Sequence, residues 1–300
     1  DNTNQLVKQM ISQNGCLMLV SQANQGLVSA RRVGFDESKG EYIAFIDGDD
    51  FIDECYFNQL YTNITKYSPD IIACGHKTII GDAVVHKNKN LIPMGYYDND
   101  DINYLVSQSA LSGDNLYYPG LFTYTWNKLF RRQLVDLVIR NIDERITIGE
   151  DALLTFGCLT QASSLLVVDS HHYNYVQHNT SMMNYNLSEK IEYQQIKLLY
   201  DNLETISYGL KRRLPIKHIE DYICSLLFIR CPNVFIDYFR SIGEKIEIFD
   251  QFNGSFIFGS GVFARILSRK FPSELALWSD TNNCLHELIE DNCEWKDYRY

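Results

Sequence analysis

Two apolar runs of strand length, each preceded by a helix-like stretch, constrain the fold of this chain most strongly. They are "CLMLV" at 16–20 and "YIAFI" at 42–46, and neither shows polar alternation. The helix-like stretches run from Leu6 to Ile11 and from Leu27 to Ser38. Strands that are covered on both faces need no polar alternation, and parallel strands need such helical connections. The order helix, strand, helix, strand therefore predicts an α/β layer with a mostly parallel sheet.

The same alternation continues to about residue 169. The sequence predicts a helix over 53–67, a strand over 70–76, an irregular loop over 81–101, a helix that begins at Glu150, and a strand over 165–169. Two amphipathic helical stretches follow within 187–250 and are separated near Pro215. The chain thus reads as an α/β domain followed by a helical region.

The last fifty residues change character again. "SFIFGSGVFARIL" predicts a strand, a glycine turn and a helix, with Asp280 about twenty residues farther on. This spacing is that of a dinucleotide-binding turn, in which a helix N-terminus meets a pyrophosphate. The segment is too short for a complete nucleotide-binding half. We therefore expect a partial Rossmann-like appendage that packs or mediates association, with an NAD site as the alternative.

Net charge and cysteine usage limit the classes of protein. The formal net charge is −11 and the pI is about 5.1, which argues against a broad nucleic-acid-binding surface. Eight cysteines are scattered without any C-x-x-C pair, a pattern typical of reduced thiols in the cytosol. No apolar run is long enough for a transmembrane helix, and the polar first residues do not resemble a signal peptide.

Three carboxylates follow the second apolar run directly. "EYIAFIDGDD" ends in Asp47, Asp49 and Asp50, interrupted only by Gly48. In an open α/β sheet, ligands bind at the carboxyl ends of the strands. Acids packed this closely repel one another, and a hard divalent cation relieves that repulsion. The stretch indicates a metal-diphosphate site, although an acidic turn that caps a helix near Asp53 explains it equally well.

Four blocks, in the same order, resemble inverting family 2 glycosyltransferases, which have the GT-A fold. They are "NQGLVSARRVGFDESKGEYIAFIDGDD", "WNKLFRR", "IGEDALLTF" and "YVQHNTSMM". The resemblance extends over about 160 residues and is therefore far more specific than the D-x-D triplet alone. It implies a nucleotide-sugar-binding domain of α/β type and a metal-dependent sugar transfer.

Carried over residue by residue, the resemblance implies a donor site. Asp47 and Asp49 would be the D-x-D pair that binds Mn²⁺ or Mg²⁺ and the donor, with Asp49 as a metal ligand. Arg31 would lie near the nucleotide diphosphate. Asp50 would support the turn or the acceptor side. Arg32 stands where the family usually has Asn, so a salt bridge explains it as well as a ligand contact does.

The resemblance also implies the catalytic carboxylates. Inverting transfer needs one general base to take the proton of the acceptor hydroxyl. Asp151 matches the family's base, and Glu150 would orient the acceptor or the base. Acids at the start of a helix are also stabilised by the helix dipole, which is the structural alternative.

Further residues are candidates for the acceptor side and for the diphosphate. Trp126 is either a platform for a sugar ring or a core anchor, and Asn127 and Lys128 follow it in the same block. His178, in a polar loop after the last strand of the sheet, would approach the diphosphate or the metal when the loop closes.

One part of the family pattern is missing. Family members begin with a strand and a D-D-G-S block that hold the base and ribose, and the first residues here resemble only its tail. We therefore expect that the sequence is a fragment of a longer protein. The predicted domains are an N-terminally incomplete GT-A domain over 1–186, a helical linker region over 187–250 and a partial Rossmann-like unit over 251–300.

The leading hypothesis is an enzyme that transfers a sugar from a nucleoside diphosphate, with UDP favoured, to a hydroxyl of a glycan or lipid-linked glycan. Such enzymes build capsule, lipopolysaccharide or other cell-surface polymers. We expect a cytoplasmic protein. Association with the inner face of the plasma membrane and formation of a homo-oligomer are both compatible with this expectation. The alternatives are an NAD-linked or nucleotide-sugar-linked oxidoreductase that uses the terminal glycine turn, and a non-catalytic glycan-assembly module.

Overall fold

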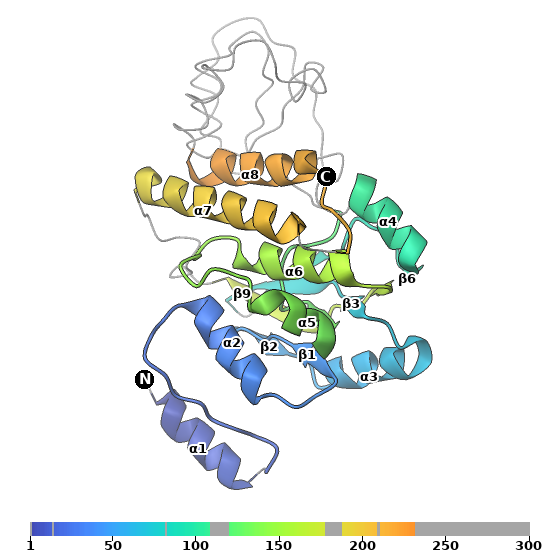
Figure 1. Ribbon diagram of the computed structural model, residues 1–300. Helices are drawn as coiled ribbons and strands as arrows, with labels where there is room; N and C mark the ends of the chain where they lie inside the picture. Colours follow the sequence, from blue (N-terminus) through green and yellow to red (C-terminus); the bar gives the residue numbers. More distant parts are fainter. Residues whose placement is uncertain are drawn as a thin grey trace, which may run out of the picture. The chain divides into compact units, whose positions relative to one another are not determined.

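The computed structural model describes residues 2–13, 15–81, 83–108, 120–177, 188–208 and 211–231 (Figure 1). The chain divides into two compact units, Asp1–Ser225 and Leu226–Tyr300, and all of the described strands lie in the first. The domain boundaries given above stay a prediction. None of the helices in the described ranges is both long and apolar enough to cross a membrane.

The helices are α1 (Thr3–Gln13), α2 (Leu27–Glu37), α3 (Tyr56–Tyr67), α4 (Asn99–Gln108), α5 (Arg132–Ile139), α6 (Glu150–Gln161), α7 (Glu189–Tyr208) and α8 (Ile216–Arg230). The strands are β1 (Tyr42–Ala44), β2 (Phe51–Ile52), β3 (Ile71–Ala73), β4 (His76–Ile80), β5 (Ala83–Asn88), β6 (Gly95–Tyr97), β7 (Lys128–Arg131), β8 (Leu165–Val167) and β9 (Tyr173–Gln177). The predicted helix start at Glu150 is confirmed, and the two helical stretches lie on either side of Pro215.

The strands form two sheets of mixed direction. The five-stranded sheet has the order β1-β7-β3-β8-β6, and the four-stranded sheet has the order β2-β9-β4-β5. Among the described strands, only β3 with β8 and β4 with β9 pair in parallel. The α/β fold is confirmed, whereas the mostly parallel sheet is wrong for these residues. The sequence could not reveal the relative directions of the strands. An apolar run has the same pattern in a parallel and in an antiparallel sheet, and strands pair in both ways.

Two local predictions are also wrong. The run 16–20 forms no strand, and Met18 is 60% exposed. No described strand pairs with this run, and a strand requires a partner for its backbone groups. The segment 81–101, predicted as an irregular loop, contains β5, β6 and the start of α4. Its strands lie at the edges of the two sheets, where one side of a strand faces solvent and polar residues are tolerated.

The start of α6 is held at a fixed place by close packing. Residues 152–160 of α6 are all buried, and the helix packs against α4, α5 and α7; Figure 1 shows α6 between α5 and α7. A Cβ atom at Gly157 would lie 2.5 Å from Val138 Cγ1, so the absence of a side chain permits the close approach of α5. Gly149 precedes the helix with a φ of 80°, and a Cβ atom there would meet Leu199 at 2.4 Å. Glycine at these positions therefore fixes where Glu150 and Asp151 begin the helix.

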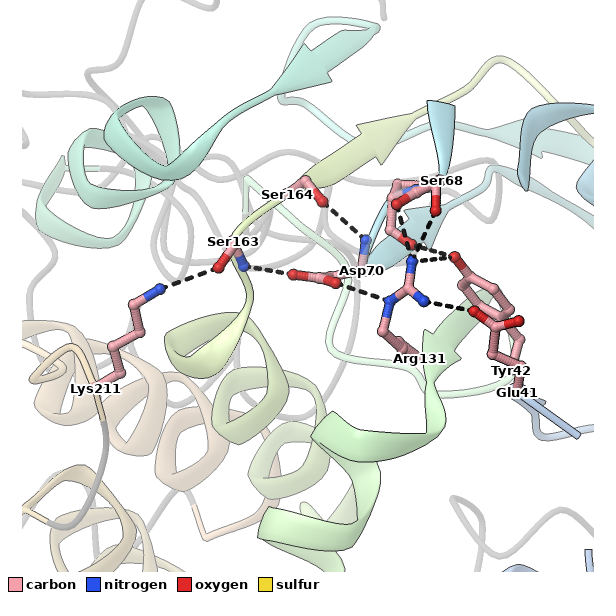
Figure 2. A network of polar contacts seen from close by, with 9 residues as sticks. Glu41, Tyr42, Ser68, Asp70, Arg131, Ser163, Ser164 and Lys211 are labelled. Atoms are coloured by element: carbon pink, nitrogen blue, oxygen red, sulfur yellow. Dashed lines mark hydrogen bonds and ion pairs between the residues drawn. The ribbon is translucent and has the colours of Figure 1, made fainter. Parts of the chain in front are cut away.

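A polar network centred on Arg131 ties together one end of the five-stranded sheet (Figure 2). The Arg131 guanidinium donates to Asp70 Oδ1 at 3.0 Å, to Glu41 Oε1 at 2.6 Å and to the Tyr42 hydroxyl at 2.7 Å. Asp70 Oδ2 accepts from the backbone N–H of Ser163 at 2.6 Å. The network thus joins the starts of β1, β3 and β8 to the end of β7. The opposite end of β1 leads to Asp47, so this anchoring leaves that end available for ligands.

We predict that Arg131→Met lowers the free energy of unfolding by about 1–3 kcal/mol, because it leaves Asp70 and its neighbours without their charged donor while the sheet end stays partly buried. Urea denaturation measures this change. Arg140→Met is the matched control: its two ion pairs, with Asp36 and Asp136, are exposed, and its effect should be much smaller. Equal effects of the two substitutions would contradict the role of the network.

Candidate functional site

Arg31 joins three carboxylates that come from two distant parts of the sequence. Its guanidinium donates a short hydrogen bond to Asp151 Oδ1, and it lies 3.4 Å from Glu150 Oε1 and 3.7 Å from Asp47 Oδ1. The side chain is only 9% exposed, and its guanidinium carbon, Cζ, lies 5.8 Å from the centre of the Phe45 ring. One cation therefore bridges the acidic end of β1 and the start of α6.

The local sequence explains why Arg31 points to this place. Val28 and Phe35 are buried on α2, and Arg31 lies one turn after Val28 on the same face. Burial lowers the pKa of Arg31, but the fields of Asp151, Glu150 and Asp47 more than offset it and raise that pKa above its ordinary value. The guanidinium is thus charged at every accessible pH and stabilises the anionic forms of its neighbours.

Glu150 and Asp47 both titrate at unusually high pH. Glu150 shares a small hollow with the apolar side chains of Val28, Ile142 and Leu154. This burial, together with the charge of Asp151, raises the pKa of Glu150. Burial likewise raises the pKa of Asp47 to about 6, against the opposing effect of the nearby guanidinium. Raised pKa values in a partly open cluster of acids are typical of sites that bind a cation or move a proton.

Asp49 and Asp50 differ sharply in their contacts. Asp49 is exposed, and it makes no hydrogen bond or ion pair within the described part of the chain. The Asp50 carboxylate accepts from the Tyr173 hydroxyl at 2.7 Å and from the backbone N–H of Val176 at 2.8 Å. Tyr173 also accepts from the backbone N–H of Asp47 at 3.2 Å. Asp50 and Tyr173 therefore connect the acidic turn to β9, and Asp49 is left to face solvent.

The donor set suits a hard divalent cation only in part. Asp47 and Asp49 supply carboxylate oxygens, the ligands that Mg²⁺ and Mn²⁺ prefer. Across the described ranges, no group of three or more His, Cys, Asp or Glu residues could hold a metal ion without further ligands. A cation bound here would need oxygens from a diphosphate and from water, as is common for Mg²⁺.

The three residues of the "WNK" block, which were predicted for the acceptor side together with Asp50, are buried. Trp126 is 3% exposed, and Asn127 and Lys128 are fully buried. The Lys128 ammonium donates to the carbonyl oxygens of Phe122 and Tyr124, both at 2.6 Å. The structure thus gives the "WNK" residues a supporting position and leaves them little surface for a sugar. Burial lowers the pKa of Lys128 to about 7.

Trp126 belongs to an aromatic cluster under the site. Its ring stacks on Tyr124 at 4.6 Å, on Tyr173 at 4.5 Å and on Tyr175 at 5.5 Å, measured between ring centroids. His76 meets the Trp126 ring edge-on at 4.8 Å. His76 is 5% exposed, and its Nδ1 has no hydrogen-bond partner within the described residues. Burial, together with the nearby Lys128, lowers the pKa of His76 to about 4.

We predict that this histidine makes the protein sensitive to acid. In the unfolded chain a histidine takes up a proton near pH 6.5, whereas native His76 resists protonation until about pH 4. The free energy of unfolding should therefore fall by about 3 kcal/mol between pH 7 and pH 4 on account of this residue. His76→Phe should remove that part of the slope, as measured by denaturant unfolding at several pH values.

The exposed His86 on β5 provides the control, and His86→Phe should retain the slope of the unsubstituted protein. If His76→Phe left the slope between pH 7 and pH 4 unchanged, the buried neutral state of His76 would be refuted.

Sequence reasoning missed Thr125, which contacts the site. The Thr125 hydroxyl donates to Asp151 Oδ1 at 3.0 Å. Arg32, for which the sequence left a salt bridge and a ligand contact open, forms a salt bridge with Glu144. It also donates to the carbonyl oxygens of Ile139 and Ile142, so it holds the turn that leads to α6. No feature of the sequence pointed to Thr125, because a threonine before a strand is ordinary.

Two predicted features lie outside the described residues. They are His178 and the terminal glycine turn, Gly259–Ala264, with Asp280. Their predicted roles, at the diphosphate and in an appendage or NAD site, stay predictions.

The structure described above is an α/β domain with acidic residues at one end of its five-stranded sheet. Residues 1–138 match the family described as glycosyl transferase family 2. The solved structure of S. aureus TarS in complex with UDP-GlcNAc superimposes with a TM-score of 0.54 at 19% identity, covering 84% of this chain and 66% of that one. The fold is therefore GT-A.

Curated relatives agree with this family. The chain is 23% identical over 184 residues to the uncharacterized glycosyltransferase EpsJ of Bacillus subtilis, covering 61% of this chain and 51% of that protein. It is 24% identical over 279 residues to the cholesterol galactosyltransferase of Borreliella burgdorferi, covering 92% of this chain and 70% of that protein. The chain thus spans only about half the length of EpsJ. Its first 138 residues match glycosyl transferase family 2, and its fold is similar to the GT-A fold of the TarS structure.

Proposed function

We propose that this protein transfers a sugar from a nucleoside-diphosphate sugar to a hydroxyl group of a glycan or lipid-linked glycan, with inversion at the anomeric carbon. The observation that carries the proposal is the contact of one guanidinium, that of Arg31, with both Asp47 and Asp151. A carboxylate suited to the donor side and one suited to a general base are thereby held next to each other, as a single displacement at one carbon requires.

The donor side of the proposal depends on the acidic turn. Asp49 projects into solvent with no partner in the described ranges, and the pKa of Asp47 is raised by burial and by neighbouring acids. Mn²⁺ or Mg²⁺ fits these oxygens, and when bound it would offset the charge of the departing diphosphate. The UDP-GlcNAc complex of the similar TarS structure favours a UDP-sugar as the donor.

The acceptor side depends on Asp151. Its side chain is 19% exposed, and its Oδ1 accepts a hydrogen bond from the Arg31 guanidinium. It can therefore accept a proton from a hydroxyl group that approaches from solvent. Glu150 is less exposed and lies in the apolar hollow, so its role is to hold Arg31 and orient the base rather than to meet the acceptor.

The biological setting is part of the same proposal. The relatives include glycosyltransferases of bacteria, which favours a role in the synthesis of cell-surface polysaccharide. A cytoplasmic location, with association at the inner face of the membrane, would give access to soluble donors and lipid-linked acceptors.

We predict that the protein releases nucleoside diphosphate from at least one member of a panel of UDP- and GDP-sugars, and that EDTA abolishes this release. Asp49→Ala should abolish it as well, because the exposed metal ligand is lost. Asp151→Asn should lower transfer to an acceptor by about 10²–10⁴-fold, because the general base is lost. Release is measured with a coupled assay for UDP or GDP and transfer with a labelled donor.

Asp36→Asn serves as the matched control, since Asp36 forms an exposed ion pair with Arg140 on the far side of the site's helix α2. It should leave both rates unchanged. Release that persists in EDTA and in both site variants would refute the proposal.

A further inference from the structure

In the described ranges, two side chains bind Asp151, and both contact the same oxygen atom. The Arg31 guanidinium and the Thr125 hydroxyl each donate to Oδ1. Within the described part of the chain, no hydrogen bond or ion pair reaches Oδ2. The carboxylate is therefore fixed through Oδ1, and Oδ2 is the oxygen that can contact an acceptor.

Thr125 is well suited to fix an orientation. It is fully buried, so its hydroxyl does not exchange between the carboxylate and bulk water. A hydrogen bond to a charged acceptor is also stronger than one between neutral groups. Arg31 alone would hold Oδ1 but would be shared with Glu150 and Asp47, whereas the Thr125 hydroxyl donates to Asp151 alone among the described residues.

The turn that carries Thr125 is itself fixed from below. The buried Lys128 ammonium donates to the carbonyl oxygens of Phe122 and Tyr124, and to Asn127 Oδ1 at 2.8 Å. Its three donors thus have three acceptors, two of which are backbone atoms of the segment directly before Thr125.

Further hydrogen bonds hold the turn that carries Thr125 from two sides. Asn90 accepts from the backbone N–H of Phe122 at 3.0 Å and donates to the carbonyl oxygen of Cys74 at 3.1 Å. On the other side, the Thr155 hydroxyl of α6 donates to the carbonyl oxygen of Thr123 at 2.8 Å. The turn is therefore tied both to the sheet and to the helix that carries Asp151, one turn away from it.

We propose that Thr125 is a positioning residue for the general base: with Arg31 it holds Oδ1 of Asp151 so that Oδ2 receives the acceptor proton, and buried Lys128 maintains the turn that presents Thr125. This inference rests on the proposed function. In the transfer step, the acceptor oxygen forms a bond to the anomeric carbon as its proton passes to Oδ2. The bond from that carbon to the donor phosphate breaks, and its electron pair leaves with the nucleoside diphosphate.

The proposal gives the "WNK" block a role other than contact with the acceptor. Lys128 acts on the reaction through the turn and Thr125, and its ammonium lies too deep to meet a sugar. Small displacements of a base strongly lower the rate of proton transfer. The gain from a rigid support therefore offsets the free-energy cost of burying the Lys128 ammonium.

The test compares Thr125→Val, which keeps the shape but removes the hydroxyl, with Thr125→Ser, which keeps the hydroxyl. Each is assayed with the best donor and with the pyranoside that gives the fastest transfer in a panel of methyl glycosides. We expect Thr125→Val to lower kcat about 10- to 100-fold with the donor KM unchanged, the effect of losing one hydrogen bond to a charged group. Thr125→Ser should recover most of the rate.

Thr160→Val is the matched control. Thr160 lies on α6, the helix that carries Asp151, and is as buried as Thr125, but its hydroxyl donates to the Gly157 carbonyl oxygen. It should leave kcat unchanged. If valine at 125 disturbs folding, as shown by thermal melting, Thr125→Ala tests the same hydroxyl with less bulk.

The outcomes separate this inference from the proposed function. A protein that transfers no sugar from any donor refutes the proposed function. If the unsubstituted protein transfers sugar and Thr125→Val does so at the same kcat, the proposed function stands and the positioning role is refuted. A loss of rate that Thr125→Ser does not recover, or that Thr160→Val shares, likewise refutes the positioning role.

Discussion

The site depends on one buried cation. Arg31 lies between the acidic end of β1 and the start of α6, two segments that are more than a hundred residues apart in the sequence. Without it, Asp47, Glu150 and Asp151 would be three neighbouring carboxylates in a partly desolvated place, and mutual repulsion would protonate some of them or drive them apart. The positive charge of Arg31 offsets this repulsion and holds the acidic turn and the start of α6 together.

The scaffold holds the two sides of this cluster by different means. The acidic turn is attached to β9 through Asp50 and Tyr173, while the start of α6 is held by buried helix packing and by glycines at 149 and 157. Because β7 runs antiparallel between β1 and β3, its beginning lies at the same end of the sheet as Asp47, and its end lies in the Arg131 network. One strand thereby connects the anchored end of the sheet to the functional end.

Much of the framework could be predicted. The apolar runs at 42–46 and 165–169, the helix that begins at Glu150 and the acidic residues after β1 follow from local patterns, since burial and helix periodicity are properties of neighbouring residues. The directions of the strands, the exposed run at 16–20 and the strands within 81–101 could not be predicted. They depend on which segments pair, and pairing partners lie far away along the chain.

The sequence by itself determined the residue types and their order: acids after a buried strand, an acid pair at a helix start, and the blocks that resemble family 2 glycosyltransferases. Only the tertiary structure decided where these acids lie and what they contact. It showed that Asp49 faces solvent while Asp50 is bound by the protein, that Trp126 and Lys128 are buried beneath the site, and that Thr125 contacts the same oxygen of Asp151 as Arg31. The reason is physical: hydrogen bonds and burial are set by distances in space, and spacing along the sequence fixes those distances only within a single helix or strand.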